Sequence, residues 1–126
     1  MNISPSMEAI RAFSRSMEVT ANNIANVNTD GFRFSRVHFE AGPGGEGVRA
    51  QDAQESSRSG GLVRRDEVME NADGGFEQHS TMVESSNTDL AEEMVHLNID
   101  STGMEANIAT LRTMEETTGH ILNLLV

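Results

Sequence analysis

The sequence contains no cysteine, lysine, tryptophan or tyrosine among its 126 residues. Without cysteine it can form no disulfide, no thiolate nucleophile and no thiolate metal site, and without lysine it has no phosphate-binding P-loop lysine and no Schiff base. Hydrophobic residues make up 37% of the chain, and its only aromatic side chains are five phenylalanines, so large buried side chains are few. The composition predicts one small domain at most, with less than a self-sufficient core.

Positive charge is also scarce. Nine arginines face 20 acidic residues, which gives a formal net charge of -11, and the only local basic cluster is the pair Arg64 and Arg65. Nucleic-acid binding draws most of its affinity from clustered basic side chains, so we expect no nucleic-acid partner. The N-terminus has neither a charged leader nor an apolar run, and we therefore expect no cleaved signal peptide and no lipid insertion.

The first 28 residues predict a helix. Ser4 is a plausible N-cap before Pro5, and the turn-forming run from Asn26 to Gly31 should end the helix between Ala25 and Asn28. Alternating spacings of three and four residues, as in a coiled-coil seam, connect Ile3, Ser6, Ile10, Phe13, Met17, Thr20, Ile24 and Val27.

The last forty residues predict a second helix. Asp89 and Glu92 form a capping pair at its start, while Gly103 and Gly119 should each weaken it by roughly 1 kcal/mol relative to alanine. The same heptad spacing connects Leu90, Met94, Leu97, Ser101, Met104, Ile108, Leu111, Glu115, Thr118, Leu122 and Leu125. Since both seams are imperfect, we expect each helix to need a partner.

The segment between the helices is rich in glycine, serine and charge. Alternating apolar residues from Phe32 to Phe39 predict a short strand, and a phase slip at Ser35–Arg36 predicts a bulge in it. The apolar pairs at 62–63 and 68–69 suggest a further strand or hairpin, and residues 71–75 a turn. The alternative for this segment is partial disorder in the isolated chain.

These patterns predict a mainly α fold whose terminal helices pair as a coiled-coil-like hairpin, with a small β or irregular region between them. We expect three parts: an N-terminal helix over residues 1–28, a β- and loop-rich middle over 29–86, and a C-terminal helix over 87–126. The proposed assembly seam comprises Ile10, Phe13, Met17, Ile24, Val27, Leu90, Met94, Leu97, Met104, Ile108, Leu111, Leu122 and Leu125.

Three patterns could carry chemistry, and each is incomplete. Glycines 42, 44 and 47 satisfy G-x-G-x-x-G, but no apolar helical face follows them to hold a pyrophosphate, so a loop is expected. Glu93 and His96 have the spacing of di-iron carboxylate bundles, yet the first helix supplies no histidine, and a solvated acidic face is expected instead. Serine, histidine and aspartate occur without a G-x-S-x-G elbow. We expect no catalytic residue, cofactor or metal.

Two segments resemble the bacterial flagellar basal-body rod family. Residues 21–33, Ala-Asn-Asn-Ile-Ala-Asn-Val-Asn-Thr-Asp-Gly-Phe-Arg, are similar to its N-terminal signature, and residues 83–95 are similar to its C-terminal motif. Residues 105–107 match a further short pattern, and the short middle resembles the proximal-rod members. The signature positions are Asn22, Asn23, Asn26, Asn28, Gly31, Phe32, Asn87, Asp89 and Leu90.

The resemblance implies a structural, non-enzymatic subunit of the periplasmic rod. Its terminal helices would polymerise into a helical tube that transmits torque and carries export, and its partners would be other copies, other rod proteins and the flagellar export apparatus. It also implies type III export without a cleaved signal peptide. The alternative is a non-flagellar helical-bundle protein with a binding or metal-binding role.

Overall fold

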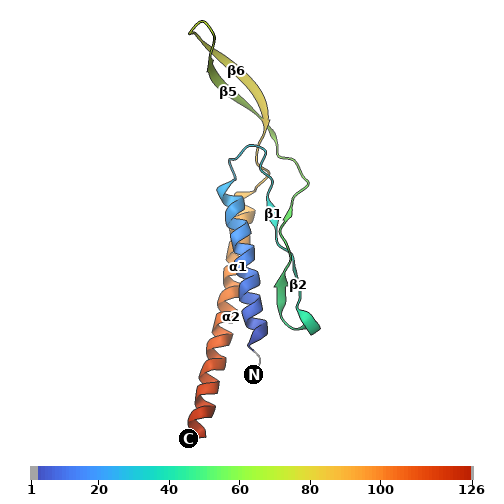
Figure 1. Ribbon diagram of the computed structural model, residues 1–126, viewed down its shortest axis with the longest axis vertical. Coiled ribbons are helices and arrows are strands. Elements are labelled where there is room, and N and C mark those ends of the chain that lie inside the picture. Colours follow the sequence, from blue (N-terminus) through green and yellow to red (C-terminus); the bar gives the residue numbers. More distant parts are fainter. Residues whose placement is uncertain (1–2, 126) are drawn as a thin grey trace.

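A computed structural model describes residues 3–125, apart from the side chain of Pro43. Two long helices, α1 (Ser4–Ala25) and α2 (Leu90–Leu124), lie side by side and antiparallel, so that both ends of the chain lie at the same end of the molecule (Figure 1). Helix accounts for 48% of residues and strand for 23%, so the predicted helix pair and small β region are confirmed, although "mainly α" fits only loosely.

Within residues 3–125, six strands form three separate antiparallel pairs. β1 pairs with β4, β2 with β3, and β5 with β6, and a short 3-10 turn, η1 (Pro43–Gly45), lies between β2 and β3. The strands are β1 (Ser35–Arg36), β2 (Phe39–Ala41), β3 (Val48–Ala50), β4 (Gln54–Glu55), β5 (Leu62–Glu70) and β6 (Phe76–Glu84). The prediction of a single bulged strand from Phe32 to Phe39 is wrong, because this segment contributes to two strands that pair with different partners, β1 with β4 and β2 with β3.

The ends of α1 differ slightly from the prediction. Ile3 occupies the N-cap position, so the predicted N-cap Ser4 is instead the first helical residue, with Pro5 in the first turn. Proline is tolerated there because its missing N–H would have no helical acceptor. The C-terminal end at Ala25 agrees with the prediction, and the backbone N–H of Asn26 closes the last turn on the carbonyls of Asn22 and Asn23.

α2 begins where the sequence predicted. The Asp89 carboxylate accepts hydrogen bonds from the backbone N–H groups of Ala91 and Glu92, at 2.9 and 3.3 Å, and so satisfies two donors that lack helical partners. The Glu92 side chain makes an ion pair with Arg36 instead of folding back onto the cap. The helix continues without interruption through both of its glycines.

Close approach between the helices explains the glycine at position 103. A Cβ atom there would lie 2.6 Å from Cζ of Phe13, whose ring packs edge-on against Phe39 with centroids 5.4 Å apart. One hydrogen at this position thus leaves room for an aromatic ring between α1, α2 and β2. At Gly119, by contrast, no described heavy atom beyond the adjacent residues and backbone of its own helix lies within 4 Å of the corresponding point.

The least exposed positions of α2 keep the predicted heptad spacing but follow a different stripe. They include polar residues: Glu93 and Asp100 are buried, with Leu97 and Met104 half-buried between and beyond them. On α1 the buried apolar residues are Ala9, Ala12 and Val19. The core is therefore small, and small side chains let α1 approach both α2 and the strands β1 and β3 that pack along it (Figure 1).

The β5–β6 hairpin projects from the end of the molecule opposite to the chain termini (Figure 1). Its register pairs Leu62 with Glu84 and Glu70 with Phe76, and nearly all of its side chains are exposed. The predicted turn over residues 71–75 is confirmed, with Gly74 at a φ of 76° and the Asn71 side chain accepting from the N–H of Gly75. Each strand is longer than the apolar pairs suggested.

Candidate assembly site

A buried polar junction joins the two helices to β1. Asn23 has 0% of its surface exposed, and its amide nitrogen donates to the Ser35 carbonyl at 2.8 Å and to the Glu93 carboxylate at 3.1 Å. Its amide oxygen accepts from the Ser35 N–H at 2.9 Å. One asparagine side chain therefore connects α1, β1 and α2.

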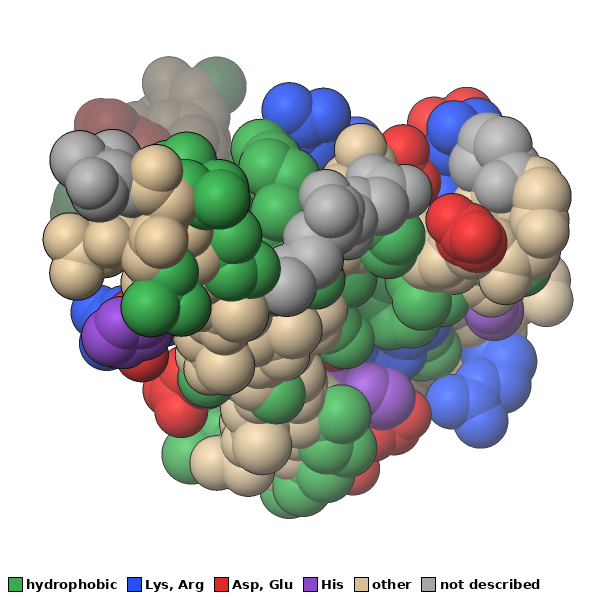
Figure 2. All heavy atoms as spheres, turned by 90° about the horizontal axis from the view of Figure 1, so that it is seen from below, with side chains coloured by type: hydrophobic (Ala, Val, Ile, Leu, Met, Phe, Trp, Pro, Cys, Tyr) green, Lys and Arg blue, Asp and Glu red, His purple; other side chains and the backbone are tan. Residues whose placement is uncertain are grey.

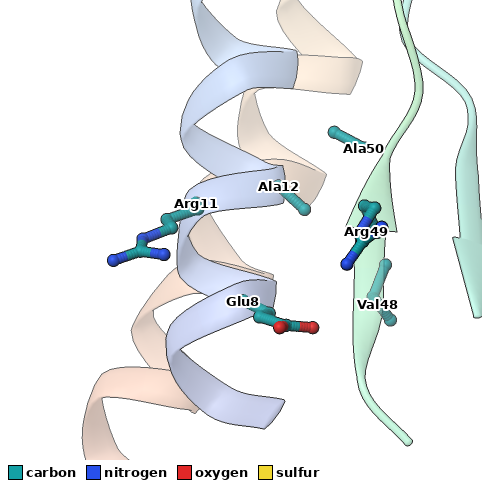
Figure 3. Close-up of a pocket in the computed structure, with 6 residues that line it drawn as sticks. All are labelled: Glu8, Arg11, Ala12, Val48, Arg49 and Ala50. Carbon is teal, nitrogen blue, oxygen red and sulfur yellow. The ribbon is translucent and has the colours of Figure 1, made fainter. Parts of the chain in front are cut away.

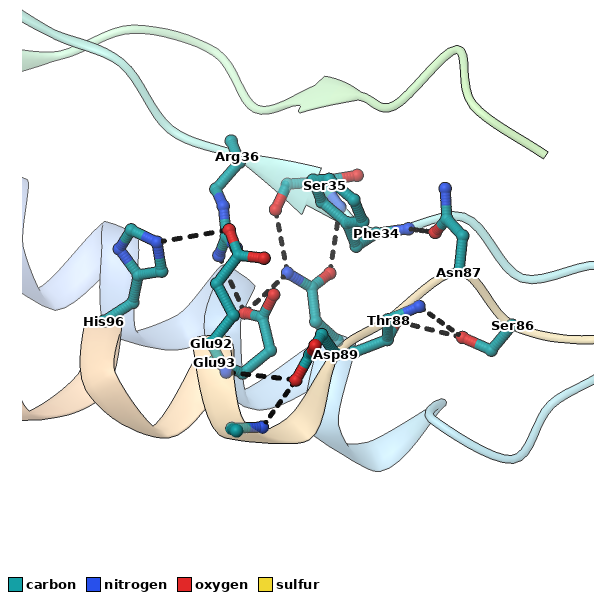
Figure 4. Close-up of polar contacts among 12 residues, drawn as sticks. Phe34, Ser35, Arg36, Ser86, Asn87, Thr88, Asp89, Glu92, Glu93 and His96 are labelled. Atoms are coloured by element: carbon teal, nitrogen blue, oxygen red, sulfur yellow. Dashed lines mark hydrogen bonds and ion pairs between the residues drawn. The ribbon is translucent and has the colours of Figure 1, made fainter. Parts of the chain in front are cut away.

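Arginine completes the junction from β1. Arg36 donates to Glu93 at 2.8 Å and to Glu92 at 2.9 Å, so its guanidinium bridges two adjacent carboxylates of α2 (Figure 4). Glu93 is fully buried, and the expectation that it lies on a solvated acidic face is wrong. Burial of this charge is tolerated because Arg36 and Asn23 both donate to one oxygen, Oε2. The other oxygen, Oε1, has no hydrogen-bond partner among the described residues.

The turn after α1 is held by its own asparagine and by a distant strand. The Asn26 amide donates to the Asn22 carbonyl at 2.9 Å, and its oxygen accepts from the Thr29 hydroxyl at 3.1 Å. Gly31 has a φ of 68°, a conformation that favours glycine, and its N–H donates to the Glu84 carbonyl at 2.7 Å. These bonds direct the chain from α1 toward β1.

Asp30 connects the same turn to the projecting hairpin. Both of its carboxylate oxygens accept from the Arg65 guanidinium, at 2.7 and 2.8 Å. These hydrogen bonds with Asp30 raise the pKa of Arg65. The pair is exposed, so it orients the hairpin more than it stabilises the fold.

Asn87 holds the segment before α2. Its amide oxygen accepts from the N–H of Phe34 at 2.8 Å, and its amide nitrogen donates to the Arg58 carbonyl at 2.6 Å. The structure thus brings Asn23, Asn26, Gly31, Asn87 and Asp89 together around one end of the helix pair. The other signature residues lie nearby in the chain: Asn22, Asn28 and Leu90 are exposed and Phe32 is half-buried.

The proposed seam residues divide into two groups. Half-buried positions are Ile10, Phe13, Met17, Ile24, Val27, Leu97, Met104 and Leu111, and exposed positions are Leu90, Met94, Ile108, Leu122 and Leu125. The first group lies beside the contact between α1 and α2. The second group offers apolar surface that the described part of the chain does not cover.

The final turns of α2 extend past the start of α1. The two helices are aligned by two contacts: the Ser14 hydroxyl lies 3.6 Å from the Met104 sulfur, and Asn23 contacts Glu93. In each facing pair the two residue numbers add up to about 117. Ser4, where α1 begins, therefore lies opposite a residue of α2 near position 113. About ten residues of α2, roughly 16 Å of helix, therefore have no α1 alongside. Leu122, Leu124 and Leu125 are 60%, 85% and 78% exposed there. Figure 2 views this end, where hydrophobic side chains lie open on the surface.

The glycine-rich motif forms a connection between strands. Residues 42–47 join β2 to β3, with the Gly42 N–H donating to the Gly47 carbonyl at 3.1 Å, and Gly44, Gly45 and Gly47 have positive φ angles. A strand follows the motif, whereas a dinucleotide site needs a helix N-terminus there. The motif closes a hairpin whose Gly47 lies against Pro5 of α1.

A shallow cavity of about 250 Å³ lies between α1 and β3. Glu8 and Ala12 point from α1 toward Val48, Arg49 and Ala50, as Figure 3 shows. No group of three histidine, aspartate or glutamate side chains in residues 3–125 could hold a metal ion. Within the same residues, no helix is long and apolar enough to span a membrane.

Residues 5–33 match the family model described as flagella basal body rod protein. The matched segment comprises nearly all of α1 and the turn that follows it, including Asn23, Asn26 and Gly31. No curated protein sequence matches the chain significantly. The rod family is structural and is not a family of enzymes. Residues 5–33 are therefore similar to the flagella basal body rod protein family, in agreement with the resemblance noted in the sequence.

Proposed function

We propose that this protein is a structural subunit of the flagellar rod that polymerises through its terminal helices into a helical tube. The tube would transmit torque and carry exported subunits, and the chain would reach it through the flagellar export apparatus without loss of a signal peptide. Its partners would be copies of itself and other rod proteins. The match over residues 5–33 supports a rod component.

The observation that carries the assembly mechanism is the uncovered apolar surface of α2. Leu122 and Leu125 lie where α1 no longer runs alongside, and Met94 and Ile108 are 60% and 39% exposed. Burial of a leucine side chain contributes about 1.5–3 kcal/mol relative to leaving it in water, so contact with a neighbouring helix would stabilise both chains. A self-contained domain would gain nothing from leaving these side chains exposed.

Motility of strains in which a variant is the only copy tests this proposal. Leu122→Asp and Leu125→Asp should leave the isolated chain folded, because both positions are exposed, but they should abolish rod completion and swimming, because a carboxylate would be buried between subunits. Glu105→Gln, on an exposed part of the same helix, is the matched control and should swim normally. Normal swimming of both aspartate strains would contradict assembly through this surface.

A further inference from the structure

A cavity of about 450 Å³ lies where α1, α2 and the segment from β1 to β2 meet. Thr20 contributes to its wall from α1, His38 from the segment between the strands, and His96 and Asp100 from α2. Its volume falls in the range typical of ligand-binding pockets. Val37, Phe39 and Ile99 make much of its lining apolar, and one carboxylate lies among them.

Asp100 is the unusual residue in this wall. Only 4% of its surface is exposed, and its Oδ2 atom has no hydrogen-bond partner among the described residues. A buried carboxylate without a donor destabilises a fold by several kcal/mol, and native structures nearly always pair such groups. The folded chain itself therefore supplies no donor to this oxygen.

The nearby cation is already engaged. Arg36 also lines the cavity, but its two terminal nitrogens donate to Glu92 and Glu93. His96 lies against Glu92, with 3.7 Å between its Nε2 atom and the carboxylate oxygen. The Arg36 guanidinium is therefore occupied by the two glutamates of the junction, and no ion pair forms between it and Asp100.

We propose that this cavity receives an arginine side chain from a second copy of the chain, with its guanidinium donating to Asp100. The inference rests on the proposed function, because assembly is what brings a second copy to this surface. The chain has no lysine, and four arginines form no ion pair within residues 3–125: Arg11, Arg49, Arg58 and Arg112. The Arg11 guanidinium turns away from β3 toward the outside of α1 (Figure 3).

Charge complementarity favours this occupant over an apolar group. A planar guanidinium donates to a carboxylate through two parallel hydrogen bonds and is less strongly hydrated than an ammonium, so it is the cation best suited to a partly buried pair. The pair would join copies of a chain whose net charge of -11 otherwise keeps them apart. An unpaired buried carboxylate in the free subunit thus becomes a specific contact in the assembled one.

Sedimentation equilibrium of the full chain tests the proposal by measuring the dissociation constant of self-association. Asp100→Asn should weaken self-association at least tenfold. One of Arg11→Gln, Arg49→Gln, Arg58→Gln and Arg112→Gln should weaken it equally, and combining that change with Asp100→Asn should cause no further loss. Asp73→Asn, in the exposed hairpin turn, is the control and should change nothing.

Urea unfolding of the dilute monomer separates this role from a structural one. If Asp100 is paired only in the assembled state, the Asp100→Asn monomer should unfold at the same or a higher urea concentration than the unaltered chain, because the substitution removes an unpartnered buried charge. Earlier unfolding of the monomer would overturn the proposal. The proposal would also be overturned if Asp100→Asn left self-association unchanged, or if the unaltered chain did not self-associate. A third contradicting result is that the loss of self-association caused by Asp100→Asn adds to the loss caused by every arginine variant.

The failure of this inference can be distinguished from failure of the proposed function. If the Asp100→Asn variant self-associates normally while Leu122→Asp still abolishes the rod, only the arginine contact is overturned. Normal swimming of the Leu122→Asp and Leu125→Asp strains overturns the assembly surface itself.

Discussion

Replacing Asn23 with alanine should reduce stability more than any other change at a polar residue of α1. The substitution removes two hydrogen bonds with the Ser35 backbone and one with the Glu93 carboxylate. Neutral hydrogen bonds contribute about 1 kcal/mol each and those to charged groups about 1.5–3 kcal/mol, so the expected loss in the free energy of unfolding is about 3–5 kcal/mol. This is a large fraction of the roughly 5–15 kcal/mol by which small proteins are stable.

Urea unfolding followed by far-ultraviolet circular dichroism measures this loss. Asn98→Ala is the control, because Asn98 is exposed on α2 and alanine is the better helix former, so its effect should be within about 0.5 kcal/mol. Glu93→Gln combined with Asn23→Ala should show a coupling of about 0.5–3 kcal/mol, since the two side chains share a hydrogen bond. A loss below about 1 kcal/mol for Asn23→Ala, or additivity with Glu93→Gln, would refute the role of the junction.

Four further predictions concern α2 and the absence of ligand binding. Gly103→Ala should destabilise the chain by about 1–3 kcal/mol, because the added Cβ would collide with the Phe13 ring. Gly119→Ala should instead stabilise α2 by up to about 1 kcal/mol. Thermal unfolding of both variants tests this difference, and equal effects on stability would contradict it. Asp89→Ala should cost about 1 kcal/mol through loss of the N-cap, measured by urea unfolding, and an unchanged midpoint would show that the cap contributes nothing. Hydrogen exchange of the dilute chain should show the weakest protection of α2 over residues 115–124, where α1 is absent, and protection equal to that of residues 93–111 would rule out an unsupported overhang. Calorimetric titration with zinc, ferrous or calcium ions should show no stoichiometric binding, and a micromolar isotherm would refute this.

Local signals predicted the helices and turns because the residues responsible are neighbours in the sequence. The heptad spacing and the Asn-rich run after Ala25 indicated the first helix and its end, and Asp89 marked the start of the second. The turn at 71–75 followed from its asparagine and glycines. In each case the backbone partner of the decisive side chain lies within a few positions, so propensity and capping are sufficient.

The junction could not be predicted in the same way. Asn23 and Glu93 are 70 residues apart and Arg36 comes from a two-residue strand, so nothing in the local sequence indicates that they meet. Glu93 was expected to be exposed, like the acidic residues around it, because helix periodicity identifies the buried face of a helix from its apolar residues alone. The heptad interpretation also selected the larger side chains of α1, whereas the closest packing uses Ala9 and Ala12.

The polar junction and Gly103 together determine how the two helices align, which the apolar residues alone would not do. A slip of one helical turn moves a residue by about 5.4 Å along the axis. It would separate Glu93 from both Asn23 and Arg36, leaving a buried carboxylate without donors, and would place a side chain larger than glycine against the Phe13 ring. Leucine and methionine pack adaptably, so a seam made only of such residues would tolerate the slip. Because the alignment is fixed at the end where α2 begins, the length of α2 that extends past Ser4 is fixed as well. In the assembly that we propose, each subunit would therefore present the same exposed leucines at the same height to its neighbour.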